Sequence, residues 1–309
     1  MHLIHNLLVL IACDSLAVAF LSRSPKQGFD WDSTQYLIAF GDSYTYIQGT
    51  EGHPNYSFIG DQLDFGYNAQ TLLNDKIVQN RLWDFAFAGA DISVDHTPLH
   101  HNFTVSLVNQ VAQYRTYGHP VLKHIVQPSS TLVAIWIGIN DINDSAKYTV
   151  HFPSFYNELM DTLFASVLTL YSLGYRSYLF MNLPPLDRTP SNQKRASPSP
   201  NATQVAWFNE ALAQHAGRFA HRYSDTNVLL FNAHSVLNDM MDHPAQSEIL
   251  NTTSFCSGYD QPDIEWNHQS YGCPTPVHTY FWFNSGHLTS HVHKLLAKAV
   301  EETLKQWTG

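Results

Sequence analysis

The chain has 309 residues, of which 44% are hydrophobic and 13% aromatic, enough for a large α/β domain with a buried core. Its formal net charge is −10, and only 14% of its residues are charged. Because nucleic acids and anionic membrane surfaces are bound through clustered Lys and Arg, this balance argues against both as partners.

The first element is a short apolar stretch, residues 3–19, that ends in the sequence Ala-Val-Ala. Small residues at this spacing after such a run are typical of a secretory signal peptide. We therefore predict that residues 1–19 are removed and that residues 20–309 form a single domain. The alternative is an N-terminal anchor helix, although the run is shorter than a membrane span. No later stretch is long and apolar enough to cross a bilayer.

N-glycosylation triplets also favour export. Five asparagines are followed two residues later by Ser or Thr without an intervening Pro, namely Asn55, Asn102, Asn143, Asn201 and Asn251. We expect a secreted glycoprotein.

The cysteines agree with an oxidising compartment. Once Cys13 leaves with the signal peptide, Cys256 and Cys273 remain. A lone pair in a secreted chain predicts one disulfide, here in a polar loop near the C-terminus. The alternative is two unrelated buried thiols.

Short apolar runs alternate with helical patterns along the chain. We predict strands over residues 36–40, 83–88, 131–137, 177–181 and 227–231. We predict helices over residues 107–114, 155–170, 206–223, 233–241 and 290–307, with Ser290 as a possible cap of the last one. Residues 183–203, rich in Pro, Ser and Asn, indicate a surface loop. This order predicts three layers, with helices on both faces of a parallel sheet of about five strands.

Candidate catalytic residues follow the first three strands, and the carboxyl ends of strands are where such sheets place their sites. Ser43 is a candidate nucleophile whose N–H can also hold an oxyanion. Gly89 can present a second backbone N–H, and the Asn140 amide a third donor. His287, before the last helix, is a candidate base. Taken singly, each residue has a plain alternative: a helix cap, a turn glycine, an Asx turn and a structural histidine.

Four segments together resemble the GDSL or SGNH hydrolase superfamily. They are Phe40-Gly41-Asp42-Ser43-Tyr44, Phe87-Ala88-Gly89-Ala90, Gly138-Ile139-Asn140-Asp141 and Asn284-Ser285-Gly286-His287. The longer stretches 85–91 and 135–141 are similar to the secreted fungal esterases of carbohydrate esterase family 16. The resemblance implies a three-layer α/β/α fold and removal of acetyl groups from plant cell-wall sugars.

Asn284 departs from the family pattern, which has Asp three residues before the His. An amide can accept the Nδ1–H of the imidazole but supplies no charge. Three interpretations are open: Asn284 orients His287, another carboxylate (Asp260, Asp263 or Glu265) does so, or the enzyme is weak. We favour the first. Without a carboxylate, the pKa of His287 is expected to stay near its usual value of about 6.5.

We therefore expect a secreted, monomeric serine esterase that hydrolyses O-acetyl esters of sugars through an acyl-enzyme, without a metal or organic cofactor. The alternatives are a lipid or short-chain acyl esterase and a catalytically weak carbohydrate-binding protein. A catalytic metal would have to use His100, His101, His119, His124 or the pair His287 and His291. The zinc-protease motif His-Glu-x-x-His is absent from the sequence.

Overall fold

The computed structural model describes residues 19–20, 28–46 and 82–307. Residues 1–18 of the predicted signal peptide, with Cys13, and the predicted glycosylation site Asn55 lie outside these residues. In the described part of the chain, no helix combines the length and the apolar character that crossing a membrane requires.

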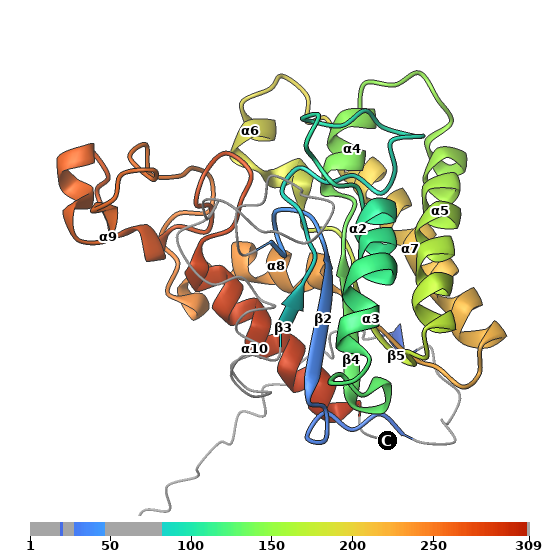
Figure 1. Cartoon of the computed structure of the whole chain (residues 1–309). Helices are drawn as coiled ribbons and strands as arrows, with labels where there is room; N and C mark the ends of the chain where they lie inside the picture. Colours follow the sequence, from blue (N-terminus) through green and yellow to red (C-terminus); the bar gives the residue numbers. More distant parts are fainter. Residues whose placement is uncertain (1–18, 21–27, 47–81, 308–309) are drawn as a thin grey trace, which may run out of the picture.

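One sheet forms the centre of the molecule, with the strand order β1-β6-β5-β4-β2-β3 (Figure 1). Its strands are β1 (Ala19–Phe20), β2 (Tyr36–Gly41), β3 (Leu82–Asp84), β4 (Thr131–Trp136), β5 (Ser177–Met181) and β6 (Asn227–Phe231). Strands β2 to β6 run parallel, as predicted, and β1 adds an unpredicted antiparallel edge on β6. The predicted cleavage point after Ala19 falls within β1, and cleavage there stays a prediction.

The central strands are apolar because both of their faces are covered. Every residue of β4, β5 and β6 is buried. The edge strand β3 is shorter than the predicted 83–88. The chain nevertheless stays beside β2, because the N–H of Phe85 donates to Ala39 O at 2.8 Å and that of Phe87 to Gly41 O at 3.1 Å.

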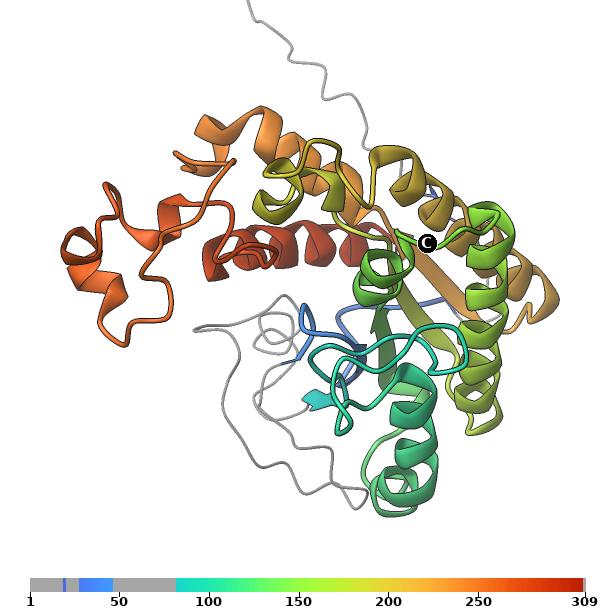
Figure 2. The same cartoon turned by 90° about the horizontal axis from the view of Figure 1, so that it is seen from above.

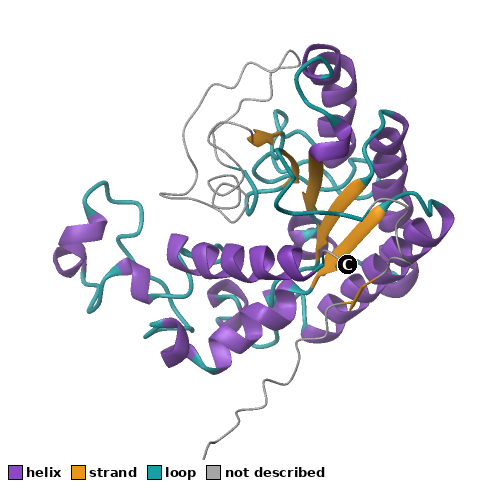
Figure 3. Cartoon of the chain, turned by 90° about the horizontal axis from the view of Figure 1, so that it is seen from below, coloured by secondary structure: helices purple, strands orange, loops and turns teal. Residues whose placement is uncertain are grey.

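Helices cover the two faces of the sheet (Figures 2 and 3). On one face lie α2 (Leu107–Gln113), α5 (Phe152–Ser172) and α7 (Ala202–Arg222), and on the other α8 (Ala233–Asp242) and α10 (Ser290–Gln306). Shorter helices are α3 (His119–Leu122), α4 (Ile139–Ser145), α6 (Pro190–Gln193) and α9 (Ile264–Asn267), and a π-helical turn, Tyr114–Gly118, extends α2. The predicted three layers are therefore confirmed.

Side-chain caps explain why two helices begin where they do. The Asn201 side chain accepts from the N–H of Gln204, whose side chain accepts from the N–H of Asn201, both at 2.9 Å. This capping box starts α7 before the predicted residue 206. Thr289 caps α10, so the prediction of Ser290 as its cap was wrong.

The predicted loop 183–203 contains α6 and a buried polar residue. The Asn192 amide donates to Leu186 O at 2.8 Å and to Pro200 O at 3.1 Å. These bonds fold the segment onto itself, so it is more regular than its composition suggests.

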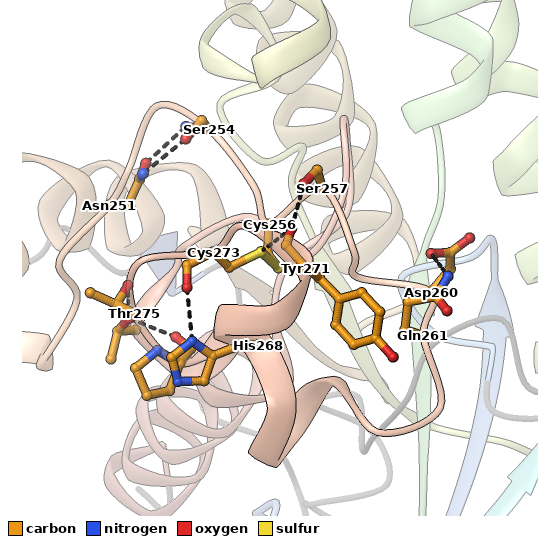
Figure 4. The surroundings of a disulfide bond; sticks show 12 residues. Asn251, Ser254, Cys256, Ser257, Asp260, Gln261, His268, Tyr271, Cys273 and Thr275 are labelled. Atoms are coloured by element: carbon orange, nitrogen blue, oxygen red, sulfur yellow. Dashed lines mark hydrogen bonds between the residues drawn. A yellow bond between two sulfur atoms is a disulfide. The ribbon is translucent and has the colours of Figure 1, made fainter.

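A small disulfide-containing lobe precedes the histidine segment. Cys256 and Cys273 are bonded, with their Cα atoms 5.4 Å apart (Figure 4). Both are buried in a separate apolar cluster that includes Ile264, Tyr280 and Phe283. Because Phe283 directly precedes Asn284, this cluster fixes one side of the candidate site.

Candidate active site

The candidate site lies where the direction of the strand order reverses. From β2 the chain continues to β3 on one side, and from β4 it continues to β5 on the other. Open parallel sheets bind their ligands at such a point, beyond the carboxyl ends of the two strands. Ser43 follows β2 and Asn140 follows β4, so the topology brings these two residues to one edge of the sheet.

Ser43 and His287 are in direct contact although 244 positions separate them. The Ser43 Oγ lies 2.8 Å from the His287 Nε2, and both residues are half-buried. A hydroxyl at this distance from an imidazole nitrogen can lose its proton to it as it attacks a carbonyl carbon. The structure therefore brings the predicted nucleophile and base together.

Gly41 positions Ser43, the candidate nucleophile. A Cβ at Gly41 would lie 2.3 Å from the Trp136 carbonyl oxygen, so only glycine fits beside β4. The buried Gln110 amide bonds both backbone groups of Gly41, donating to its oxygen at 2.8 Å and accepting from its N–H at 3.1 Å. Sequence reasoning missed Gln110. The sequence does contain a signal for it, because Gln110 is a polar residue on the apolar helix face that Leu107 and Tyr114 define.

His287 sits in a short, tightly bonded loop. The N–H of Phe283 donates to His287 O at 2.8 Å, and Trp282 pairs with Leu288 in an antiparallel bridge. The Tyr44 hydroxyl donates to Gly286 O. This bond ties the loop to the residue that follows the nucleophile, so the two halves of the site share a direct link.

Asn284 orients the imidazole through its oxygen. Its Oδ1 accepts from the N–H of Gly286 at 3.0 Å and of His287 at 2.9 Å, and lies 2.9 Å from the His287 Nδ1. Because two backbone donors need an acceptor there, the amide cannot turn its NH₂ toward the ring. Nδ1 therefore carries the proton, and Nε2 faces Ser43 as an acceptor.

Two of the three alternative carboxylates, Asp260 and Asp263, are engaged elsewhere, and the third, Glu265, is an exposed residue. Asp263 accepts from the Tyr271 hydroxyl at 2.6 Å and from the Asn267 amide at 2.8 Å. Asp260 accepts from the Gln261 amide in the disulfide lobe (Figure 4). Within the described residues, Asn284 is the side chain bonded to Nδ1. This arrangement favours the first of the three interpretations.

The expected pKa of His287 was wrong because sequence alone does not show how deeply the ring is surrounded. Desolvation by burial disfavours the imidazolium and lowers the pKa to about 4. The ring is therefore uncharged at neutral and mildly acidic pH.

Two of the candidate oxyanion donors, Gly89 in a turn and Asn140 on α4, lie on segments that are bonded to each other. Gly89 has φ +75°, which favours glycine, and is half-buried. The buried Asn140 donates from Nδ2 to Ala90 O at 2.9 Å. In the described part of the chain, the backbone N–H groups of Ser43 and Gly89 have no hydrogen-bond acceptor. These groups can therefore hold a developing negative charge.

Three buried carboxylates, each within two residues of a candidate site residue, were not predicted as part of the site. Asp42 accepts from the N–H of Tyr44 at 3.0 Å, and Asp141 accepts from that of Ile92 at 3.0 and 3.1 Å. Burial raises the pKa of Asp42 and of Asp91 to about 7 and that of Asp141 well above its usual range. Asp42 directly precedes Ser43, Asp141 directly follows Asn140, and Asp91 follows Gly89 by two residues, and this proximity is the signal in the sequence.

We expect Asn140→Ala to lower kcat for ester hydrolysis by about 10²–10³, because one donor to the transition-state oxyanion is lost. KM should change little, since the neutral ester carbonyl needs this donor less. Initial-rate kinetics on p-nitrophenyl acetate would measure the effect. The matched control is Asn143→Gln, which changes an exposed side chain on the same helix, α4. Equal losses in both variants would contradict the role of Asn140.

The predicted glycosylation sites differ in the exposure and the hydrogen bonding of their asparagine side chains. Asn102 and Asn143 are exposed, while Asn201 is exposed but caps α7. The half-buried Asn251 donates from Nδ2 to Ser254 Oγ at 2.8 Å, which engages one of the two N–H bonds of its amide. Attachment of glycans stays a prediction.

The histidine pair at 287 and 291 does not form a metal-binding unit. His291 lies on α10 and its Nε2 contacts Ser247 O at 2.8 Å, whereas His287 precedes the helix and contacts Ser43. The spacing of four residues therefore does not place both rings on one helical face.

Comparison with known proteins agrees with this geometry. The family model described as GDSL-like Lipase/Acylhydrolase matches residues 37–300. An acetylesterase of Thermothelomyces thermophilus is 26% identical over 292 residues, 88% of this chain and 89% of that protein. The GDSL esterase/lipase APG of Arabidopsis thaliana is 22% identical over 245 residues, 72% of this chain and 69% of that protein.

The fold has a counterpart among solved structures. Est24, a carbohydrate acetylesterase from Sinorhizobium meliloti, matches with a TM-score of 0.51 and 13% identity, covering 88% of this chain and 99% of that one. The family match spans β2 to α10 and includes all four candidate segments. The chain therefore belongs to the GDSL-like lipase/acylhydrolase family, and it is an ester hydrolase.

Proposed function

We propose that this chain is a secreted acetylesterase that removes O-acetyl groups from plant cell-wall sugars or oligosaccharides. The observation that carries the mechanism is the chain of contacts from Ser43 Oγ to His287 Nε2 and from His287 Nδ1 to Asn284 Oδ1, at 2.8 and 2.9 Å. This is the arrangement that acyl transfer by a serine requires.

In the first half of the reaction, Ser43 Oγ forms a bond to the acetyl carbonyl carbon while its proton passes to His287 Nε2. The tetrahedral oxyanion rests against the N–H groups of Ser43 and Gly89 and the Asn140 amide. The bond to the sugar oxygen then breaks. His287 gives its proton to that oxygen, so the sugar leaves as an alcohol and the acetyl group stays on Ser43.

In the second half, water attacks the acetyl-Ser43 ester and gives a proton to His287. The bond between Ser43 Oγ and the carbonyl carbon breaks, His287 returns the proton to Oγ, and acetate leaves. No step requires a metal or an organic cofactor.

The acetylesterase relative, similar over most of the chain, supports a short acyl group. An exposed aromatic side chain near residues 87–90, here called the oxyanion loop, supports a sugar as the alcohol part of the substrate. Phe103 is 50% exposed, its ring is stacked with that of His101 at 5.0 Å, and the neighbouring His100 packs beside Gly89. An exposed aromatic face can stack on the apolar face of a sugar ring.

Several features support secretion. They are the predicted signal peptide, the five predicted glycosylation triplets and the Cys256–Cys273 disulfide, a bond that persists in oxidising compartments. The charge balance supports neither nucleic acid nor an anionic membrane as a partner, and we expect a monomer.

Substrate profiling tests the proposal. We expect acetate release from acetylated xylo-oligosaccharides and, on p-nitrophenyl esters, a kcat/KM that is highest for acetate and falls by at least about tenfold by hexanoate. A rise of kcat/KM with acyl length would instead identify a lipid esterase. Binding of the oligosaccharide without turnover that depends on Ser43 would identify a carbohydrate-binding protein.

A further inference from the structure

Three side chains beside the oxyanion loop converge outside the catalytic contacts. Asp91, His100 and Asp144 each place one possible ligand atom within 4.8 Å of the other two. Asp91 follows Gly89 by two residues, and Asp144 follows Asn140 by one helical turn on α4. The group thus spans the two segments that carry the candidate oxyanion donors.

Asp91 is the buried member of this group and has no adequate partner. Its residue is 0% exposed, and within the described residues neither carboxylate oxygen makes a hydrogen bond of normal length and angle. A buried carboxylate of this kind needs a proton or a cation.

His100 and Asp144 complete the group from the solvent side. The His100 Nε2 lies 2.7 Å from the Asp144 Oδ2, and their side chains are 33% and 27% exposed. A cation can therefore reach the group from solvent. His100 also lies against the oxyanion loop: a Cβ built on Gly89 would be 3.4 Å from the His100 Cβ.

From this convergence we infer that Asp91, His100 and Asp144 bind a divalent transition-metal ion of the zinc class. One imidazole nitrogen and two carboxylate oxygens suit Zn²⁺, with water as the fourth ligand, whereas Ca²⁺ and Mg²⁺ prefer oxygen ligands alone. The ion would replace the hydrogen bond between His100 and Asp144. It would join the Gly89 turn to α4 as a structural brace and take no part in proton transfer.

Zinc binding to the full, untagged chain tests this inference without any substrate, so it is independent of the proposed function. We expect titration calorimetry to show one saturable Zn²⁺ site per chain. A hundredfold excess of Zn²⁺ over Kd should raise Tm by at least about 3 °C. Asp144→Asn and His100→Gln should each weaken this site by at least about tenfold and remove the rise in Tm.

A matched control is available on α8. His243 and Asp239 form an exposed pair at 3.0 Å that has no third candidate ligand among the described residues, so Asp239→Asn should leave the zinc site intact. Titration with Mg²⁺ and Ca²⁺ should give no comparable site. Wild-type protein that does not bind Zn²⁺, or variants Asp144→Asn and His100→Gln that bind it like the wild type, would overturn the inference.

Discussion

Replacement of Ser43 by alanine is expected to lower kcat for acetyl ester hydrolysis by about 10⁶, the size of loss seen when a serine hydrolase loses its nucleophile. His287 would keep its contact with Asn284, but no oxygen would remain to form the acyl-enzyme. Thermal unfolding should change little, because Ser43 is half-buried and, among the described residues, its hydroxyl is hydrogen-bonded to His287. Initial rates on p-nitrophenyl acetate and a melting curve would measure both quantities.

The control for this loss lies in the histidine loop itself. Ser285 is exposed, and Ser285→Ala should keep full activity. Turnover by Ser43→Ala within tenfold of the wild type would show that another group is the nucleophile.

Replacement of Asn284 by aspartate is expected to move the acid limb of the kcat/KM profile to higher pH. In the native protein, burial lowers the pKa of His287 from its usual 6.5 to about 4. The imidazole therefore stays neutral at pH values well below 6.5. A carboxylate at the position of Asn284 Oδ1, 2.9 Å from Nδ1, would favour the imidazolium and raise this pKa. We expect an upward shift of at least about one pH unit.

The same variant should raise kcat at pH 7.5 by about tenfold, because the new charge stabilises the imidazolium that forms in the transition state. The gain is smaller than the factor of about 10⁴ lost on the reverse change in a serine protease, where the wrong tautomer is responsible. Here the backbone donors to Oδ1 fix the tautomer already.

Ser285→Asp separates this effect from that of added charge in general. It places the same charge on the exposed residue next to Asn284, away from the His287 ring. We expect this variant to shift the acid limb of the kcat/KM profile much less than Asn284→Asp does. An acid limb that stays in place in Asn284→Asp would contradict the assignment of Asn284 as the orienting residue.

Sequence patterns predicted the inner strands almost to the residue. The boundaries of β5 and β6 agree fully, because a strand buried on both faces is an uninterrupted apolar run. The edge strand β3 is shorter than predicted because it pairs with one neighbour in the described sheet, β2. The short helix α4 was missed because its sequence, Ile-Asn-Asp-Ile-Asn-Asp-Ser, shows too little apolar periodicity.

The sequence indicated the residues of the candidate site but not the contacts that position them. Ser43, Gly89, Asn140 and His287 were placed by their positions after strands and before a helix. The periodicity of α2 puts Gln110 on the buried face, yet nothing local says that it bonds to Gly41. Burial depth, which sets the pKa of His287, likewise depends on how distant segments pack.

The bonds between Gln110 and Gly41 also explain how the sheet opens at this edge. In a parallel pair, the N–H of Gly41 would bond to a carbonyl of the adjoining strand, but a side-chain amide takes that place. Gln110 thus imitates a peptide unit and terminates the ladder after Phe87. Beyond that point no ladder bond to β2 constrains the described chain, which can therefore adopt the turn at Gly89, with φ +75°, that carries a candidate oxyanion donor.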